Sequence, residues 1–415
     1  MLTLLLLPPL ALRPPPPPRM LRMATRRPPP FMLARRGKRT APASPRVMQR
    51  SATGVPEIAA CHPERYSSLL RGKVAHMEAL LAASLAAHPG AALPPAQVFE
   101  SARLHFRMRA SFKFWREGEG LHYVMFNRED ARTPQEVVHY PMGSVRMNDL
   151  MGALREELLA APSLAQRVND ARFLTTTTGE ALVTLTYNRP IAAPCSRGLM
   201  WEAEAAAVAE RLGVSIIGRS RNVAIATGAQ TVRERLHVEG RGVCEYEQME
   251  GAFTQPNAGV CQSMLAWAYD ATRGLDATDL CELYCGNGCF TIALAPNFRR
   301  VVATEVSKTS VLLAETNLRH NNISNVRIAR LSAEEFAMAY YGKRPFRRLE
   351  EAGIFVEDFT RRSTPSSSTL RAPGWTPRAF PYTPHLECGV LLERRSLSML
   401  RGIQNASHAL GGVGQ

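Results

Sequence analysis

A short glycine-rich run and a carboxylate about twenty residues further on are the groups best placed to do chemistry. Residues 285–289 read Cys-Gly-Asn-Gly-Cys and follow a buried-type strand predicted over 280–284. Gly286 and Gly288 let the backbone pass close to a ligand, and the helix predicted to follow offers free N–H groups at its start. Glu305 ends the next predicted strand, where its carboxylate can accept hydrogen bonds from a ribose diol. The layout predicts a nucleotide-type binding site.

Two cofactors suit a site of this kind. Residues 282–288, ELYCGNG, lack the third glycine that packs a dinucleotide-binding helix against its strand, which favours S-adenosylmethionine over NAD. A two-glycine turn alone is a weak signal, since many tight turns carry one. Glu305 alone is also compatible with a solvated helix cap.

Three thiols recur every four residues around the same turn, at Cys281, Cys285 and Cys289. Gly286 and Gly288 interrupt the continuous helix that would bring them together, so we expect no metal site. The chain has 8 Cys and no CxxC pair, which fits free thiols in a reducing compartment better than a disulfide framework.

The elements that must position these groups change character along the chain. Beyond about residue 258, strands and helices alternate, which predicts a doubly wound α/β sheet. Its predicted helices are 261–271 and 308–321, and its strands are 280–284, 300–304 and 326–331. The preceding region predicts an α+β domain with antiparallel strands. Its elements are a helix over 57–88, a hairpin within 104–126, a helix over 147–159, strands 171–176 and 181–187, a helix over 202–212 and a strand over 214–218.

The basic charge gathers at the N-terminus. Of the net +15, eleven positive charges lie in residues 1–50, which hold no Asp or Glu, so the other 365 residues carry +4. Residues 1–55 also hold twelve of the 30 prolines and cannot build a packed core. We predict that this segment is a disordered leader. It is either a transit peptide for a mitochondrion or chloroplast, or the product of a misassigned start codon on a cytoplasmic protein. No apolar run approaches the roughly 20 residues that span a bilayer, so we expect no membrane partner.

Several separated motifs occur along the chain in a fixed order. They are 253–257 (FTQPN), 282–288 (ELYCGNG), 303–305 (ATE), 380–383 (FPYT) and 385–392 (HLECGVLL), preceded by 106–110 (FRMRA) and 173–176 (FLTT). Together these motifs resemble the bacterial type of the tRNA (uracil-5-)-methyltransferase family, and the two early ones resemble its RNA-contacting domain. The resemblance covers about 66–354 and resumes over 380–392.

The resemblance implies methyl transfer from S-adenosylmethionine to carbon-5 of a uridine in the T-loop of tRNA. In such chemistry a Cys thiolate adds to carbon-6 of the ring, and a general base later removes the carbon-5 proton. Glu387 matches the base, and Gln255, Tyr284 and Glu305 match cofactor-binding positions, beside Gly286 and Gly288 of the turn.

The resemblance also implies an RNA surface, because the target base must be flipped out and held on rings or guanidinium groups. Phe106, Arg107 and Arg109 are the candidates for this surface. The alternative from alternation alone is an amphipathic strand with Phe106 and Phe112 in the core. We expect a monomer with tRNA as its partner.

The chain departs from the family where the nucleophile should be. It has neither a DPPR-type nor an SCNP-type motif, and residues 355–379 resemble a linker. Cys388 neighbours Glu387 on a predicted strand and therefore points to the opposite face, and Cys285 lies on the cofactor turn, so neither replaces the nucleophile well. The explanations are a skipped coding segment or an inactive tRNA-binding paralogue. We predict four segments: a leader over 1–55, the tRNA-binding region over 56–250, an incomplete methyltransferase domain over 251–395 and a tail over 396–415.

Overall fold

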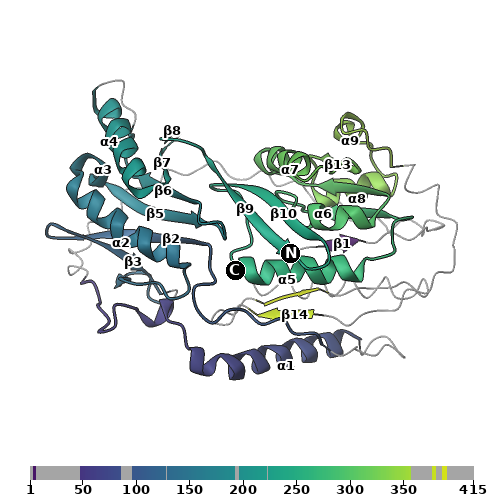
Figure 1. Ribbon diagram of the computed structural model, residues 1–415, viewed down its shortest axis with the longest axis horizontal. Coiled ribbons are helices and arrows are strands. Elements are labelled where there is room, and N and C mark those ends of the chain that lie inside the picture. Colours follow the sequence, from purple (N-terminus) through teal and green to yellow (C-terminus); the bar gives the residue numbers. More distant parts are fainter. Residues whose placement is uncertain are drawn as a thin grey trace, which may run out of the picture.

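The computed structural model forms two regions, joined by a β-hairpin that lies between them (Figure 1). One region is built on a large, mostly antiparallel sheet, and the other on a smaller sheet with parallel strands. The described residues are 3–5, 47–85, 96–127, 129–191, 196–221, 223–356, 376–379 and 386–389.

The first region is organised by the large sheet, whose strand order is β4-β3-β2-β5-β6-β7-β8. Neighbouring strands run antiparallel except β6 and β7, which are parallel. Apolar residues of α2 and α4, such as Leu154 and Trp201, join Phe112 and Phe173 of the sheet in one core. Period-two alternation produces this result, since Phe112 points to the helices while Lys113 beside it is half-exposed. The strands are β2 Arg109–Glu117, β3 Gly120–Met125, β4 Gln135–Glu136, β5 Val168–Thr175, β6 Ala181–Tyr187, β7 Ser215–Ser220 and β8 Val223–Ala226, and the helices are α2 Val145–Ala160, α3 Pro162–Ala165 and α4 Ser196–Leu212.

The hairpin between the regions consists of β9 (Thr231–Val238) and β10 (Gly242–Met249). Its inward residues, including Leu236 and Tyr246, share a core with helix α5 of the second region. By packing, most of the hairpin therefore goes with the second region, although the sequence grouped residues up to 250 with the first. Val232 at the start of β9 packs instead on Leu174, Leu182 and Ile217 of the large sheet. Alternation along β9 shows that it is a strand but does not show which core it covers.

The second region holds parallel strands in the order β11-β12-β13. Leu280 and Val301 face the core shared with α5 and α6, while Cys281 and Val302 face a core shared with α8 and α9. The sheet is thus covered on both faces, which explains why its strands are apolar throughout. The strands are β11 Asp279–Leu283, β12 Arg300–Thr304 and β13 Val326–Ala329, and the helices are α5 Ala258–Ala271, α6 Cys289–Leu294, α7 Lys308–His320, α8 Ala333–Tyr340 and α9 Arg347–Glu351.

The predicted leader is structured at both of its ends, which corrects the expectation for residues 1–55. Strand β1 (Thr3–Leu5) pairs antiparallel with β11, on the edge that β12 leaves open. An open edge presents unpaired N–H and C=O groups, and an added strand satisfies them. Near the other end, Gln49 pairs with Gln135 at the edge of the large sheet, and Met48 is buried. Residues 6–46 lie outside the described residues.

One further α-helix and two further strands complete the α-helices and strands of the described residues. Helix α1 (Tyr66–Leu85) lies beside β14 (Thr376–Ala379), which pairs antiparallel with β15 (Leu386–Gly389) (Figure 1). This two-stranded sheet is separate from the parallel sheet. The FPYT motif at 380–383 and the linker-like residues 357–375 lie outside the described residues.

The predicted fold class is confirmed: an α+β region with antiparallel strands precedes a Rossmann-like α/β region. The first hairpin starts later than expected, at Arg109, because residues 104–108 do not form a regular strand and His105 adopts a positive φ of 56°. Within the part of the chain that the structure describes, no helix has the length and apolarity to cross a bilayer.

Candidate cofactor and RNA-binding site

The glycine-rich turn is a strained backbone cradle between β11 and α6. Tyr284, Gly286 and Gly288 all have positive φ, at 61°, 58° and 83°. The backbone turns tightly here, with the Gly288 N–H donating to the Cys285 carbonyl at 2.9 Å and the Cys285 N–H donating to the Thr304 carbonyl at 3.0 Å. The left-handed conformation is costly for Tyr284, whose side chain is 45% exposed. We call residues 284–288 the cradle.

Glu305 and the cradle meet as the sequence predicted. The N–H of Gly286 donates to Glu305 Oε2 at 3.1 Å, and the N–H of Ser307 donates to Oε1 at 2.7 Å. The pairing follows from topology, because β11 and β12 are parallel neighbours and both turns therefore open at the same sheet edge. At that edge, the Tyr284 hydroxyl donates to Glu334 Oε1 at 3.2 Å. Glu334, on α8, is a member of the site that sequence reasoning missed.

A buried carboxyl underlies the cradle and was also missed. Glu282 on β11 is fully buried, and the Thr291 hydroxyl on α6 donates to its Oε2 at 2.6 Å. Its other oxygen, Oε1, has no hydrogen-bond partner. Burial raises the pKa of Glu282 to about 7, although the bond from Thr291 opposes the rise. The bond joins the two elements on either side of the cradle. The signal available in the sequence was a charged residue inside an apolar strand.

The side chain of Gln255 has an unpaired polar atom, and such an atom shows whether the residues suit a cofactor. Its side-chain Oε1 is buried without a hydrogen-bond partner. Gln255 lies two residues before α5, where Asn257 caps the helix by accepting from the Val260 N–H at 3.0 Å. A cofactor with hydrogen-bond donors suits a set that offers an unpaired amide oxygen and the Glu305 carboxylate.

The predicted RNA motif lies directly against the segment that carries Gln255. The N–H of Met108 donates to the Pro256 carbonyl at 2.7 Å. The Arg109 guanidinium donates to the carbonyls of Ala252 and Thr254 at 3.2 and 3.4 Å. Two motifs more than 140 residues apart in sequence thus form one structure.

This junction also brings an exposed ring beside the arginine. The Phe253 ring lies 5.9 Å from the Arg109 guanidinium and is 63% exposed. Burial lowers the pKa of Arg109, and the charge of Arg107 adds to the effect. Arg107 is half-buried and its Nε donates to the Arg109 carbonyl at 3.0 Å. Sequence reasoning missed Phe253 as a candidate for the RNA surface.

Phe106 was predicted to contact RNA, and the structure corrects this. It is 5% exposed and belongs to the core of the first region together with Phe112. A ring held there cannot stack on a base. The alternation along 106–112 places both rings on the same face, and this was the alternative that the sequence left open.

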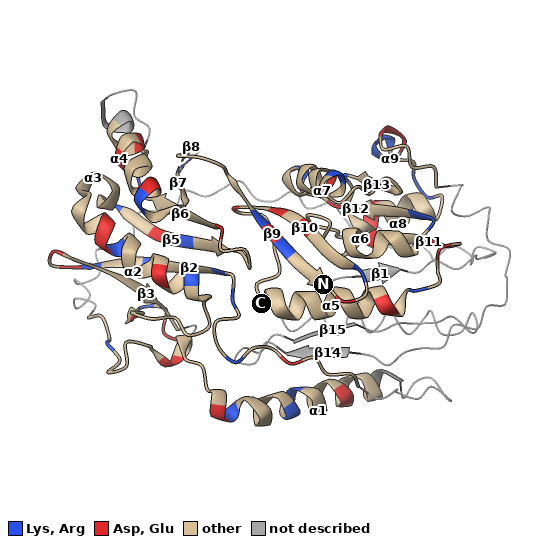
Figure 2. Cartoon of the chain, in the orientation of Figure 1, with Lys and Arg blue, Asp and Glu red and all other residues tan. Residues whose placement is uncertain are grey.

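Further cations belong to strands of the large sheet, and basic and acidic residues alternate in the colouring of these strands in Figure 2. Arg172 on β5 and Arg219 on β7 both pair with the buried Glu250, at 3.5 and 2.7 Å. Lys113 on β2 pairs with Asp170 at 2.9 Å. Arg172 and Arg219 keep 48% and 41% of their side chains exposed. The basic face defined by Arg109, Lys113, Arg172 and Arg219 is thus continuous with the Phe253 segment.

The candidate nucleophiles near the cradle are poorly suited to attack. Cys281 and Cys285 are buried, and burial raises the pKa of Cys281 to about 12 and that of Cys285 well above its usual range. The thiolate form is therefore scarce for both. Among the described residues, no group of three His, Cys, Asp or Glu side chains could hold a metal ion.

Glu387, the predicted general base, is not brought to the cradle. It lies on β15 and pairs with Arg378 of β14, in the two-stranded sheet beside α1. Within the described chain, no strand pairing links this sheet to the parallel sheet. Cys388 lies on the same strand. The role of Glu387 as a base stays a prediction.

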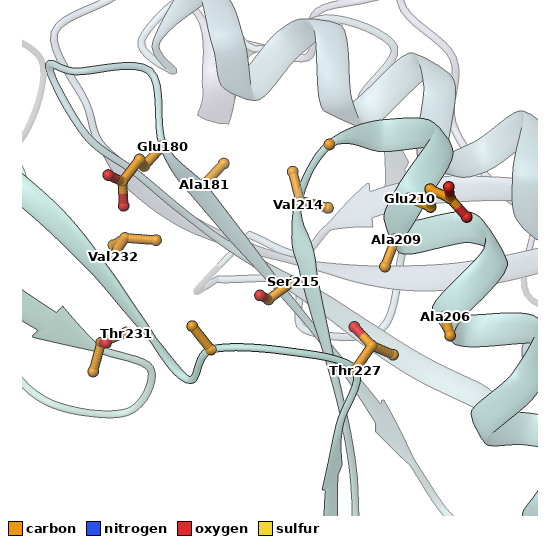
Figure 3. Close-up of a pocket in the computed structure, with 12 residues that line it drawn as sticks. Glu180, Ala181, Ala206, Ala209, Glu210, Val214, Ser215, Thr227, Thr231 and Val232 are labelled. Atoms are coloured by element: carbon orange, nitrogen blue, oxygen red, sulfur yellow. The ribbon is translucent and has the colours of Figure 1, made fainter.

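A hollow of about 490 Å³ lies elsewhere, between α4 and the strands that lead into β9 (Figure 3). Glu180, Glu210, Ser215 and Thr227 contribute to its wall. It shares no residue with the cradle or with the 252–257 segment, and we assign it no role.

Together, the fold and the site define a class: a Rossmann-like domain with a nucleotide-type cradle, attached to an antiparallel domain with a basic face. The family model for tRNA (uracil-5-)-methyltransferase matches residues 65–364. The chain belongs to this family.

Curated relatives of the same family match this chain over most of their own length. The tRNA/tmRNA (uracil-C(5))-methyltransferase of Acinetobacter baylyi is 49% identical over 270 residues, which is 64% of this chain and 73% of that protein. The protein of the same name from Chromohalobacter salexigens is 43% identical over 376 residues, covering 80% and 97% of the two chains. Among solved structures, the Pyrococcus abyssi tRNA (uracil-54, C5)-methyltransferase, in complex with S-adenosyl-L-homocysteine, has a TM-score of 0.49 at 16% identity and covers 78% of this chain and 82% of its own.

Proposed function

We propose that this protein acts in the transfer of a methyl group from S-adenosylmethionine to carbon-5 of a T-loop uridine in tRNA. The observation that carries the proposal is the junction of residues 107–109 with the 252–257 segment, through Met108, Arg109 and their backbone partners. A base held on the basic face lies next to the segment that carries Gln255. Hydrogen bonds thus join the segment proposed for RNA recognition to the segment proposed for cofactor recognition.

The cradle supplies the contacts for the cofactor. S-adenosylmethionine provides an electrophilic methyl group when bound. Glu305, which already accepts from the Gly286 N–H, keeps further lone pairs placed to accept hydrogen bonds from a ribose diol, and Gln255 Oε1 is available as an acceptor. The strained backbone at Tyr284 keeps these groups in place before binding, which reduces the entropy lost when the ligand binds.

Activation of the uracil ring needs a thiolate, and the present sequence has no SCNP-type motif to provide it. The alignment with the Chromohalobacter protein runs over 376 positions but takes up 80% of the 415 residues, about 332, so about 44 positions have no residue here. A gap of this size supports the proposal that a catalytic segment is missing between about 354 and 380.

The test is to sequence the transcript across the codons for residues 354–380 and to assay both proteins. If the transcript restores DPPR-type and SCNP-type motifs, the restored chain should methylate unmodified tRNA from radiolabelled S-adenosylmethionine. The present chain should give background counts, since loss of a covalent nucleophile costs on the order of 10⁴-fold or more. A restored chain that binds tRNA but stays inactive would contradict the proposal.

A second candidate function is tRNA binding or folding without methyl transfer. The absent SCNP-type motif and the buried thiols of Cys281 and Cys285 favour it. It predicts that the transcript matches the present sequence and that the purified chain retains tRNA in a filter-binding assay at low salt. Release of tRNA under those conditions would count against it.

Delivery to a mitochondrion or chloroplast by the Arg-rich leader is also a proposal. Its support is the composition of residues 1–50. Fusing residues 1–55 to a fluorescent protein tests it, with the Arg residues replaced by Gln as the control. Diffuse cytoplasmic signal from the unmodified fusion would contradict it. The monomeric state and the absence of a metal stay predictions.

A further inference from the structure

Two thiols lie in contact immediately behind the cradle. The Sγ atoms of Cys261 and Cys289 are 3.6 Å apart. Cys261 belongs to α5 and is buried, while Cys289 is the first residue of α6, directly after the cradle, and is partly exposed. Among the described thiols, this is the pair whose sulfur atoms lie in contact.

We propose that Cys261 and Cys289 form a reversible disulfide and that this redox modification controls the cradle. The control of the cradle, unlike the disulfide itself, rests on the function proposed above. The neighbouring Cys244 is buried in the same core, yet no group of three ligating side chains among the described residues could hold a metal. Oxidation is therefore the chemistry open to this cluster, and Cys261 with Cys289 is the pair close enough for it.

The geometry requires a small movement. A disulfide has an S–S length of about 2.05 Å, so the two sulfur atoms must approach by roughly 1.5 Å. Helices α5 and α6 pack directly on each other, and α6 is six residues long. A short helix preceded by the cradle can shift by this amount more easily than the fourteen-residue α5.

The chemistry balances with a peroxide as the oxidant. The Cys289 sulfur attacks hydrogen peroxide, which breaks the O–O bond and leaves a sulfenic acid and one water molecule. The Cys261 thiol then attacks the sulfenic sulfur, forms the S–S bond and releases a second water. Two thiols are oxidised by two electrons and one peroxide is reduced. The hydrogen bond with Cys261 and burial raise the pKa of Cys289, so the first step is slow.

The consequence for the cradle follows from what Cys289 holds. Its carbonyl accepts from the Tyr246 hydroxyl at 2.9 Å, and Gly288 before it caps α6 with a φ of 83°. Drawing Cys289 toward α5 displaces Gly288 and turns the cradle N–H groups away from their present directions. Since about 1 Å of misplacement can cost as much as 100-fold in a preorganised site, we expect cofactor affinity to fall on the order of tenfold.

The experiment uses the full purified chain, reduced or treated with hydrogen peroxide and then desalted. Peptide mapping without reductant reports the disulfide, and calorimetric titration with S-adenosylhomocysteine reports the cradle. We expect a 261–289 cross-linked peptide and an approximately tenfold weaker Kd, both reversed by dithiothreitol. Cys261→Ser and Cys289→Ala should each remove the cross-link and the response to peroxide. Cys61→Ser, in the first region, should keep both.

The outcomes separate this inference from the proposed function. Absence of the 261–289 peptide after peroxide treatment would overturn the inference, and a complete cross-link with unchanged affinity would overturn its control of the cradle. If the reduced chain does not bind S-adenosylhomocysteine at all, the cofactor assignment fails, while the peptide map still decides whether the two thiols pair. Cys289→Ala, at a partly exposed position, guards against a folding defect of the core variant.

Discussion

The two sheets differ in how completely their strands are paired. In the large sheet, β5 has β2 on one side and β6 on the other, and β6 in turn pairs with β7. In the parallel sheet, β11 has β12 on one side, and among the described strands the other side pairs with only the three residues of β1. Both sheets use helices to cover apolar faces, so the contrast lies at the sheet edge.

This difference between the sheets shows where the chain departs from its family. The region with the basic face has a fully paired central sheet, while the parallel sheet ends where the missing motifs would follow in sequence. In the proposed function, binding of tRNA and cofactor rests on elements that are present, and activation of the uridine rests on a segment that is not found. We therefore predict that the recognition and catalytic parts of the function are separable in this chain.

Hydrogen exchange should show the contrast most strongly. Backbone amides of β5 and β6 are expected to exchange about a thousandfold more slowly than those of β11, because an edge strand opens locally without unfolding its sheet. Mass spectrometry of peptides from the native chain measures this. Equal protection of the two sets would show that the three residues of β1 close the edge as well as a full strand does.

Glu282 tests the cost of the buried carboxyl beneath the cradle. The pKa of Glu282 is raised from 4.5 to about 7, so the native state binds this proton more tightly than the unfolded state does. The protonated side chain therefore contributes its full stability below pH 4.5, and this stability is lost as the pH rises to 7. Glu282→Gln should therefore raise the free energy of unfolding at pH 8 by up to about 3 kcal/mol and leave it nearly unchanged at pH 4.5. Urea unfolding at both pH values measures the difference.

The exposed Glu315 on α7 provides the matched control for this effect. Glu315→Gln should leave the free energy of unfolding unchanged at either pH. If Glu282→Gln instead lowers the free energy of unfolding at pH 8, the Glu282 carboxylate has a stabilising partner. The prediction that this buried carboxyl costs stability in the parallel sheet would then be wrong.

Sequence reasoning succeeded where a pattern is local. The bounds of β6 and β12 match their predicted strands, and the meeting of Gly286 with Glu305 follows from a strand, a turn and a parallel neighbour. It failed for Phe106, where the resemblance was followed instead of the alternation that places this ring in the core. Resemblance identifies a motif without saying which of its side chains points outward.

Long-range contacts were beyond sequence reasoning for a different reason. No local signal connects Arg109 with the carbonyls of Ala252 and Thr254, because the contact depends on how two regions are docked. The assignment of the β9–β10 hairpin to the second core has the same origin. The site could thus be predicted as two separate parts, and the structure was needed to show their junction.

Glu305 tests the cofactor side of the comparison alone. Glu305→Ala removes the acceptor for the N–H groups of Gly286 and Ser307 and the predicted contact with a ribose. We expect the affinity for S-adenosylhomocysteine to fall about tenfold, the value of one hydrogen bond to a charged group. Affinity for tRNA, measured by filter binding on the same preparation, should be unchanged. A parallel loss of tRNA affinity would indicate that the two regions are not separable.

The smallest effects are expected on the basic face, because each cation is partly solvated and shares the RNA charge with others. Arg172→Ala and Phe253→Ala should each weaken tRNA binding about fivefold, about 1 kcal/mol, and only the arginine variant should reduce the salt dependence. Arg211→Ala provides the control, since this exposed arginine pairs with Glu157 on the helical side of the large sheet. Titrations at several salt concentrations measure both quantities. Because Phe253 is uncharged, a loss of tRNA affinity in Phe253→Ala without a change in salt dependence would identify its ring as a stacking surface. Unchanged affinity in the same variant would confine the RNA contact to the charged residues of the sheet.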